Sequence, residues 1–302
     1  MYDRIVNREP KAQFRIGISG WTYKSWRGVF YPPGLVHRRE LEYASGRMNS
    51  VEINGSFYSL QRPSSYEKWA EQTPPDFLFA VKGGRFITHM KKLNDVRVPL
   101  ANFFASGVLA LGEKLGPILW QFPPNWGFDR ERVENFLEML PATTHEAAVL
   151  ATENEIVPSE RTLTETAVDV PIRYAFEVRH PSFFTAEFVR LLQSHNAALV
   201  FADAAGTWPY AEDITADFVY VRLHGAEQLY ASGYTDEQLN WWANRIGIWS
   251  RGTEPADAKR IVDEASKVRS YRDVFVYFDN DIDVHAPFDA MRLAKLLKAG
   301  SA

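Results

Sequence analysis

The sequence predicts a single (β/α)8 barrel over residues 1–302, on the basis of three observations. Eight short segments rich in β-branched and aromatic residues recur along the chain. Stretches with helical periodicity separate most of these segments, and alternation of strands with helices is typical of a parallel sheet. The chain is 302 residues long, whereas a typical barrel of this kind has about 250 residues, so there is room for insertions.

The predicted elements follow one another in a regular order. The strand segments cover residues 14–20, 50–57, 77–83, 116–122, 173–180, 197–203, 217–225 and 273–281. Helical periodicity covers residues 66–72, 98–115, 131–140, 186–195, 236–246 and 286–298. Two insertions are expected, one before the fifth strand at residues 142–171, which is mostly polar, and one before the eighth strand at residues 251–272.

Composition excludes several classes of protein. The chain has no cysteine, which rules out disulfides, zinc sites built on thiolates and a cysteine nucleophile. The first residues lack the apolar core of a signal peptide, and no apolar stretch has the length of a membrane span. We therefore expect a cytoplasmic protein that does not bind a membrane.

Charge is unevenly distributed along the chain. The net charge is -4, but the first third is basic and the remainder is acidic. A basic first third suits an anionic ligand, although ordinary solvated surface charge would give the same pattern.

The seventh strand segment shows which side chains point into the barrel. Successive residues of a strand alternate between two faces, so Val219, Val221 and Leu223 share one face while Arg222 and His224 share the other. The apolar face must pack against the surrounding helices. Arg222 and His224 therefore point inward near the C-terminal end of the strand, where barrel enzymes place their active sites.

Other strands contribute polar residues to the same interior. The set comprises Ser19, Glu52, Asn54, Lys82, Gln121, Glu177, Arg179, Asp203 and Asp279. Such a cluster could be a buried ion network that only fills the barrel. Ion pairs are a poor way to stabilise an interior, because desolvation often exceeds the Coulomb gain. A ligand-binding pocket is therefore the favoured interpretation.

The residue types indicate acid–base chemistry on an anion. Imidazole titrates near neutrality, and the planar guanidinium group binds phosphate or carboxylate. We expect the catalytic residues to be His224, Glu177, Glu52 and His180. The expected substrate contacts are Arg222, Arg179, Lys82, Asn54, Tyr58, Gln121, Asp203, Asp279, Asn280, Trp21, His89 and Tyr234. The predicted function is an enzyme of the hydrolase or lyase type, acting on a phosphorylated or otherwise anionic substrate with no cofactor and no metal.

Two alternatives stay open. A divalent metal bound by Glu52, Glu177, Asp203, His224 and Asp279 is chemically feasible. The cations that face the same mouth would repel such an ion, which makes a metal site the weaker hypothesis. The second alternative is a non-catalytic protein that binds nucleic acid or another anionic ligand on the same face, because basic residues alternate there with aromatic ones. The sequence does not indicate an oligomeric state.

Several longer stretches also resemble a known family. They include GISGWTYKSWRGVFYPPGL, VEINGSFYSLQRPS, FLFAVKGGRFITH, LWQFPPNW, FEVRHPSF, YVRLHG, YASGYTDEQL and VYFDND. In this number and order they resemble the YecE-like family, domain of unknown function 72, over essentially the whole chain. The resemblance implies a TIM-like barrel but no established reaction. The chain departs from the family pattern at VEINGSFY and at FDND, where Asp279 stands in place of the usual asparagine.

Overall fold

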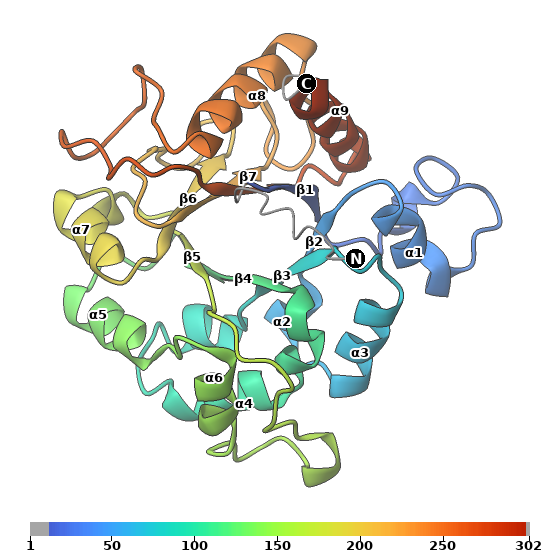
Figure 1. The fold of residues 1–302 in the computed structure, drawn as a ribbon, viewed down its shortest axis with the longest axis vertical. Helices are drawn as coiled ribbons and strands as arrows, with labels where there is room; N and C mark the ends of the chain where they lie inside the picture. Colours follow the sequence, from blue (N-terminus) through green and yellow to red (C-terminus); the bar gives the residue numbers. More distant parts are fainter. Residues whose placement is uncertain (1–11, 300–302) are drawn as a thin grey trace, which may run out of the picture.

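Eight parallel strands pair in chain order and close into a barrel, as the sequence predicts (Figure 1). The computed structural model describes residues 12–299. The strands are β1 (Phe14–Ser19), β2 (Ser50–Ile53), β3 (Leu78–Lys82), β4 (Leu115–Gln121), β5 (Tyr174–Glu177), β6 (Ala198–Asp203), β7 (Phe218–Leu223) and β8 (Asp273–Phe278). Strand β1 pairs with both β2 and β8, and this double pairing closes the ring.

Helices surround the strands on the outside of the barrel (Figure 1). They are α1 (Glu40–Ser45), α2 (Gly55–Tyr58), α3 (Pro63–Glu71), α4 (Arg97–Ala105), α5 (Arg130–Met139), α6 (Thr144–Ala151), α7 (Ala186–Ser194), α8 (Asp236–Ser250) and α9 (His285–Ala299). Five short 3-10 segments (Lys24–Trp26, His37–Arg39, Val108–Lys114, Ser159–Arg161 and Pro181–Phe183) and a π-helical turn (Phe86–Met90) complete the connections.

Local capping explains where several helices begin. Asp129, Thr143 and Thr185 each accept a hydrogen bond from a backbone N–H in the first turn of the helix that follows. At α8, Thr235 and Gln238 bond reciprocally to each other's backbone N–H groups and form a capping box. These side chains satisfy donors that the first turn of a helix leaves without partners.

Two predicted segments differ in detail from the structure. The segment at residues 50–57 was expected to be a strand throughout, but β2 ends at Ile53 and the chain turns into α2. Asn54 adopts helical backbone angles, and its carbonyl accepts from the N–H of Phe57. The expected insertion at residues 142–171 begins with helix α6, which buries Ala147 and Ala151 and packs against α4. The insertion at residues 251–272 contains no helix or strand.

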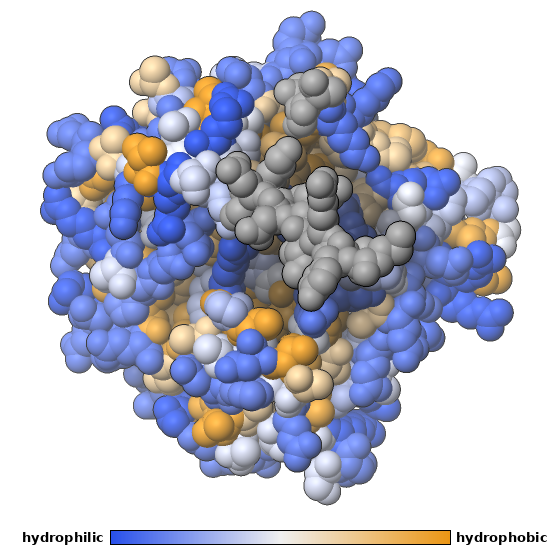
Figure 2. Space-filling view, in the orientation of Figure 1, coloured by the Kyte–Doolittle hydropathy of each residue, from blue (hydrophilic) through white to orange (hydrophobic). Residues whose placement is uncertain are grey.

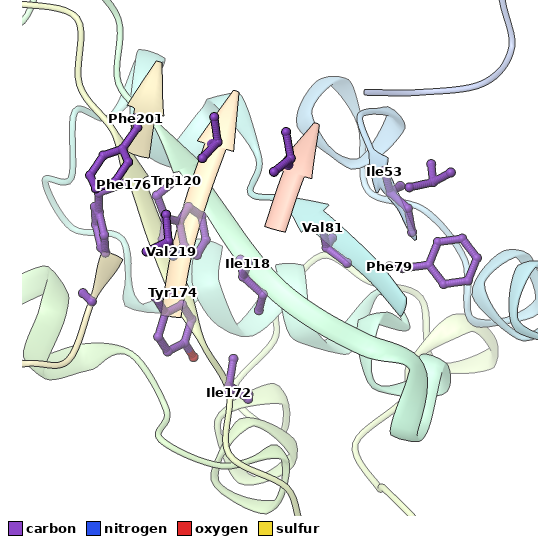
Figure 3. Close-up of a cluster of buried hydrophobic side chains, with 14 of the residues drawn as sticks. Ile53, Phe79, Val81, Ile118, Trp120, Ile172, Tyr174, Phe176, Phe201 and Val219 are labelled. Atoms are coloured by element: carbon purple, nitrogen blue, oxygen red, sulfur yellow. The ribbon is translucent and has the colours of Figure 1, made fainter. Parts of the chain in front are cut away.

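The barrel wall separates two apolar layers. Val51, Val81, Val219 and similar residues face outward and pack beneath the helices, as the sequence alternation predicts. Figure 3 shows part of this outer layer, where labelled side chains such as Trp120 and Phe176 come from neighbouring strands. The second layer lies inside the barrel and consists of residues of opposite parity. They are Ala80, Leu119, Ala175, Ala198, Val200, Ala202, Ala216, Phe218, Tyr220, Phe275 and Tyr277.

The inner layer is a packed core and not an open channel. Ala80, Ala175, Tyr220 and Tyr277 in this layer are almost completely buried. On the side of the molecule seen in Figure 2 the surface is largely hydrophilic, and hydrophobic residues occur in scattered patches. None of the helices between residues 12 and 299 has the length and apolar character of a membrane span.

Substitution of Gly17 should test the tight packing of β1 against β2. A Cβ atom at Gly17 would lie 1.9 Å from the carbonyl oxygen of Ser50, which no real side chain tolerates. We expect Gly17→Ala to lower the free energy of unfolding by about 1–3 kcal/mol, because the backbones must separate. Gly46→Ala is the matched control, since its Cβ would meet nothing closer than 3.6 Å. Equal urea midpoints for the two variants would contradict this packing.

Candidate functional site

Arg222 lies at the centre of the barrel mouth and pairs with carboxylates from three other strands. Its Nη2 is 2.8 Å from Glu52 of β2 and 2.9 Å from Asp279, which follows β8. Its Nη1 is 2.6 Å from Glu177 of β5. Arg222, Glu52 and Glu177 are fully buried, and the side chain of Asp279 is 13% exposed. One guanidinium group therefore connects β2, β5, β7 and β8.

Additional hydrogen bonds complete this cluster. Arg222 also donates to Ser19 Oγ at 2.9 Å and through Nε to Glu52 at 3.1 Å. The Tyr220 hydroxyl, one step below on β7, donates to Glu52 at 2.6 Å. Arginine has five N–H donors, and here protein acceptors engage all three guanidinium nitrogens. An added anion would therefore have to displace a carboxylate in order to bind Arg222.

The charged groups in the cluster stabilise one another's ionised forms. Burial opposes ionisation of Arg222, but Glu52, Asp279 and Glu177 outweigh that effect and raise its pKa well above the usual value. Burial alone would raise the pKa of Glu177, yet Arg179 and Arg222 hold it well below the usual range. The pKa of Asp279 is also lowered, because Arg222 and His224 outweigh the effect of burial. Glu177 and Asp279 are therefore fixed anions near neutral pH and poor proton donors.

His224 belongs to the same cluster and lies beneath the cavity. Its Nδ1 is 3.0 Å from Asp279, and its Nε2 is 3.5 Å from Glu177. The imidazole is fully buried, and the rings of Trp208 and Tyr230 meet its ring edge-to-face. The sequence prediction that His224 faces inward near a carboxylate agrees with this geometry, but the imidazole does not line the open cavity.

A large cavity lies above this cluster at the C-terminal ends of the strands. Its volume is about 1380 Å³. Its basic side chains, apart from histidine, are Arg38, Lys68, Lys82, Arg85 and Arg179, and its acidic side chains are Asp279 and Asp281. Cations outnumber carboxylates on the lining, so the cavity attracts anions.

Lys82 provides a free amine in this cavity. It ends β3, and its side chain is almost fully buried. The Nζ atom lies 4.3 Å from the centre of the Phe57 ring, and within residues 12–299 it has no hydrogen bond and no ion pair. Burial first, and then repulsion from Arg222, lowers the pKa of Lys82 to about 8. Near physiological pH a minority of this amine is therefore neutral, a far larger share than for an unperturbed lysine.

Asp281 and His89 also have shifted pKa values in the same cavity. Burial and the nearby charge of Asp279 raise the pKa of Asp281 to about 6. Burial, together with Lys82 and Arg179, lowers the pKa of His89 to about 4. Near neutral pH, His89 is therefore uncharged, Asp281 is mostly ionised, and Lys82 is mostly protonated.

Aromatic and amide side chains form the cavity walls. Trp21 and Trp69 meet edge-to-face with their ring centres 5.3 Å apart. Asn54 donates to Ser19 Oγ, whereas its buried Oδ1 has no partner among the described residues. Gln121 donates to Glu177 at 3.2 Å and also lines the cavity. Tyr58, which is 66% exposed, lies at the rim.

The structure brings most of the predicted site residues together, either on the lining of the cavity or directly beneath it, and leaves four of them outside. The cavity is lined by Trp21, Asn54, Tyr58, Lys82, His89, Gln121, Arg179 and Asp279. Beneath it lie Glu52, Glu177, Arg222 and His224. Asp203, Tyr234, His180 and Asn280 lie elsewhere.

Asp203 was assigned to the wrong face of its strand, and Asn280, which was expected to contact the substrate, lies outside the cavity lining. In β6 the residues that face the interior are Ala198, Val200 and Ala202, so Asp203 continues the outward face. It accepts from the hydroxyl of Tyr234 at 3.1 Å in a second cavity. Asn280 follows Phe278 on the outward face of the eighth strand segment and donates to Asp289 of α9 at 3.0 Å.

His180 also lies outside the cavity lining. Its Nδ1 accepts from the backbone N–H of Ser182 and caps the short turn Pro181–Phe183. Its parity is that of Phe176 and Val178, which face outward, so the choice of His180 as a catalytic residue rested on residue type alone.

The sequence prediction missed several residues that line the cavity. Asp281 has the same parity as Asp279 and could have been found by continuing the alternation two residues further. Gln61, Trp69 and Tyr230 come from helices and loops, where strand parity gives no signal. Within the described residues no group of three or more histidine or acidic side chains is arranged to hold a metal ion.

Comparisons with known proteins agree with the barrel. A family profile described as "Protein of unknown function DUF72" matches residues 15–302. The UPF0759 protein YunF of Bacillus subtilis is 29% identical over 129 residues, which is 39% of this chain and 43% of that protein. The UPF0759 protein YecE of Escherichia coli K12 is 28% identical over 169 residues, 56% of this chain and 49% of YecE. The matched region thus spans less than half the length of either relative.

Two solved structures share the fold. A DUF72 family protein from Thermotoga maritima superposes with a TM-score of 0.71 and 24% identity, covering 95% of this chain and 99% of that chain. A DUF72 family protein from Enterococcus faecalis superposes with a TM-score of 0.69 and 15% identity, covering 95% and 96% of the two chains.

Removal of Arg222 should be much more destabilising than removal of a surface arginine. Arg222→Met leaves Glu52, Glu177 and Asp279 buried without their shared counterion, which should cost about 3–5 kcal/mol of unfolding free energy. Arg39→Met is the matched control, because Arg39 pairs with Glu42 in solvent and its loss should leave stability nearly unchanged. Denaturant unfolding measures both. If Arg222→Met lowers the unfolding free energy as little as Arg39→Met does, the three buried carboxylates do not need Arg222 as a counterion.

Proposed function

The chain belongs to the DUF72 family, whose description is that of a protein of unknown function, and we propose that it is an enzyme acting on an anionic substrate. The reaction proposed is of the hydrolase or lyase type, and the proposed site is the cavity above Arg222. The observation that carries the proposal is the buried amine of Lys82, which faces this cavity without a hydrogen-bonding partner in the described chain.

The free amine of Lys82 supports a chemical role. A structural lysine normally forms an ion pair or reaches solvent with its amino group, because burying an unpaired charge is costly. Lys82 forms no ion pair with any described residue, its side chain is buried, and its amino group is open only towards the cavity, beside the face of Phe57. Lowered lysine pKa values of this kind are typical of groups that transfer protons or attack carbonyl carbon.

The charge pattern supports an anionic substrate. Lys82 and Arg179 lie deep in the cavity, and Arg85, Lys68 and Arg38 lie on its lining. Arg222 cannot be the main anion contact while Glu52, Glu177 and Asp279 occupy its donors. We therefore assign the anion to Lys82 and to Arg179, whose Nε and Nη2 bond to Glu177 and Tyr230 but whose Nη1 has no hydrogen-bonding partner among the described residues. Arg222 holds the floor of the cavity in place.

Two groups in the cavity have pKa values suited to proton transfer near neutrality. Asp281, with a pKa of about 6, is a base once ionised, and Lys82, with a pKa of about 8, is an acid while protonated. Glu177 and His224 pair with Arg222 and Asp279 and hold these two residues in place at the floor of the cavity.

The alternative is a non-catalytic protein that binds nucleic acid or another anionic ligand on this face. Exposed aromatic residues at the rim favour it: Tyr58 is 66% exposed, and the guanidinium of Arg85 lies 5.7 Å from its ring centre. A binding protein needs charge and stacking surfaces but no reactive amine. The reactivity of Lys82 therefore distinguishes the two functions.

Phosphate should stabilise the protein through this cavity. A ligand that binds only the folded state at ten times its Kd adds about 1.4 kcal/mol to the unfolding free energy, and Tm rises accordingly. Lys82→Met and Arg179→Met should each remove most of this gain. Lys295→Met removes one exposed positive charge on α9, and this variant should retain the full gain in stability from phosphate. The anion site is wrong if chloride at equal ionic strength stabilises as well as phosphate, or if the gain survives in both cavity variants.

Lys82 should be the most reactive lysine of the protein towards 2,4,6-trinitrobenzenesulfonate. This anionic reagent is attacked by a neutral amine and loses sulfite, so the rate follows deprotonation of the lysine. We expect the rate at Lys82 to rise with pH to a midpoint near 8, whereas an exposed lysine such as Lys295 should have a midpoint near 10.4. Peptide mass spectrometry measures each site, and phosphate should protect Lys82. A midpoint at Lys82 equal to that of Lys295 would favour the binding protein over the enzyme.

A further inference from the structure

A second cavity lies beside the first and shares no lining residue with it. Its volume is about 540 Å³, and it is formed by the end of β6, the loop that follows, and the first half of α8. Pockets of this size accept small organic ligands. Its lining contains five aromatic side chains, Trp208, Tyr210, Tyr234, Trp241 and Trp242, the carboxylates of Asp203 and Glu237, and the amine of Lys259.

Cations of the protein already cover two of the aromatic walls. The guanidinium of Arg179 lies 3.8 Å from the ring centre of Trp208, and that of Arg245 lies 4.1 Å from the ring centre of Trp241. A cation on one face of an aromatic ring draws electron density toward itself, which weakens attraction for a second cation on the other face. The same arrangement favours stacking of a planar, electron-rich ring. These walls therefore suit a flat heterocycle better than an ammonium group.

Asp203 supplies the polar contact that would orient such a ring. It accepts a hydrogen bond from Tyr234 at 3.1 Å, and no ion pair with any residue of the described chain neutralises it. Burial raises its pKa, although Tyr234 and the N–H of Ala205 oppose this effect. A partly buried carboxylate without a counterion gains most from two N–H donors presented side by side.

We propose that this second cavity binds a planar, purine-sized nitrogen heterocycle that stacks on Trp241 or Trp208 and presents two adjacent N–H groups to Asp203. Lys259 lies at the mouth, with its Nζ 5.9 Å from the ring centre of Tyr210, where it would meet an anionic substituent on the heterocycle. This inference goes beyond the proposed function and does not depend on it, because the first cavity contributes none of the lining.

Neutral nucleosides test this proposal without engaging the anion site. Guanosine presents two adjacent N–H groups at one edge, and inosine presents only one. Isothermal titration of the intact protein in phosphate buffer should show binding of guanosine and about tenfold weaker binding of inosine. Choline is a quaternary ammonium ion of the kind that aromatic cages recognise. It should bind more weakly than either nucleoside.

Variants assign the binding to this cavity. Asp203→Asn keeps the shape of the side chain but replaces one acceptor with a donor, and it should weaken guanosine binding about tenfold or more. Trp241→Ala should also weaken it, and the fold should tolerate this change because Trp241 is 43% exposed. Trp21→Ala, in the first cavity, is the matched aromatic control and should leave the affinity unchanged.

Three results would overturn the proposal. They are the absence of guanosine binding at millimolar concentration, choline binding at least as tight as guanosine binding, and loss of guanosine binding in Trp21→Ala with retention in Asp203→Asn. The second result would indicate a cation site, and the third would place the nucleoside in the first cavity.

Discussion

The pairing of Arg222 with Glu52, Glu177 and Asp279 is the interaction on which the mouth of the barrel depends. The three carboxylates come from strands β2 and β5 and from the residue after β8, and they are held together by one guanidinium group on β7. Without that cation, three negative charges would lie side by side in a nearly dry interior, where their mutual repulsion is only weakly screened. The hydroxyls of Ser19 and Tyr220 each donate a further hydrogen bond to Glu52, so the cluster is closed on the side of the apolar core. This closure gives the cavity a rigid floor.

A closed floor changes which residues remain available to a ligand. Arg222 and Glu177, which look like the obvious site residues, are occupied with one another, whereas Lys82 stands next to them without a partner of its own. The positive charge of Arg222 also repels that of Lys82 and contributes to its lowered pKa. The structural role of Arg222 and the chemical role proposed for Lys82 are therefore two consequences of one arrangement. The same coupling extends to Arg179, which pairs with Glu177 on one side and stacks on Trp208, a wall of the second cavity, on the other.

Much of this arrangement follows from strand alternation in the sequence. Alternation placed Arg222, Glu52 and Glu177 in the barrel interior, because the opposite face of each strand is apolar and must meet the helices. Asp203 was assigned to the interior on its polar character, although the parity of Ala198, Val200 and Ala202 puts it on the outward face. Alternation gives no signal for residues on helices and loops, which is why Trp69 and Tyr230 could not be placed. Nor could the sequence distinguish a guanidinium saturated by carboxylates from one free to bind an anion, because that depends on distances between strands far apart in the chain.

The central claim concerns the buried amine of Lys82. Burial and the nearby charge of Arg222 disfavour its protonated form, and no ion pair with a described residue stabilises that form. The most direct measurement is an NMR titration of the Lys82 side chain in protein labelled with ¹³C and ¹⁵N at lysine, assigned by comparison with Lys82→Met. The account predicts a midpoint near pH 8, set by burial and by the neighbouring Arg222. A midpoint near 10.4, the value of an unperturbed lysine, would contradict it, because Lys82 would then be an ordinary cation with no special chemistry.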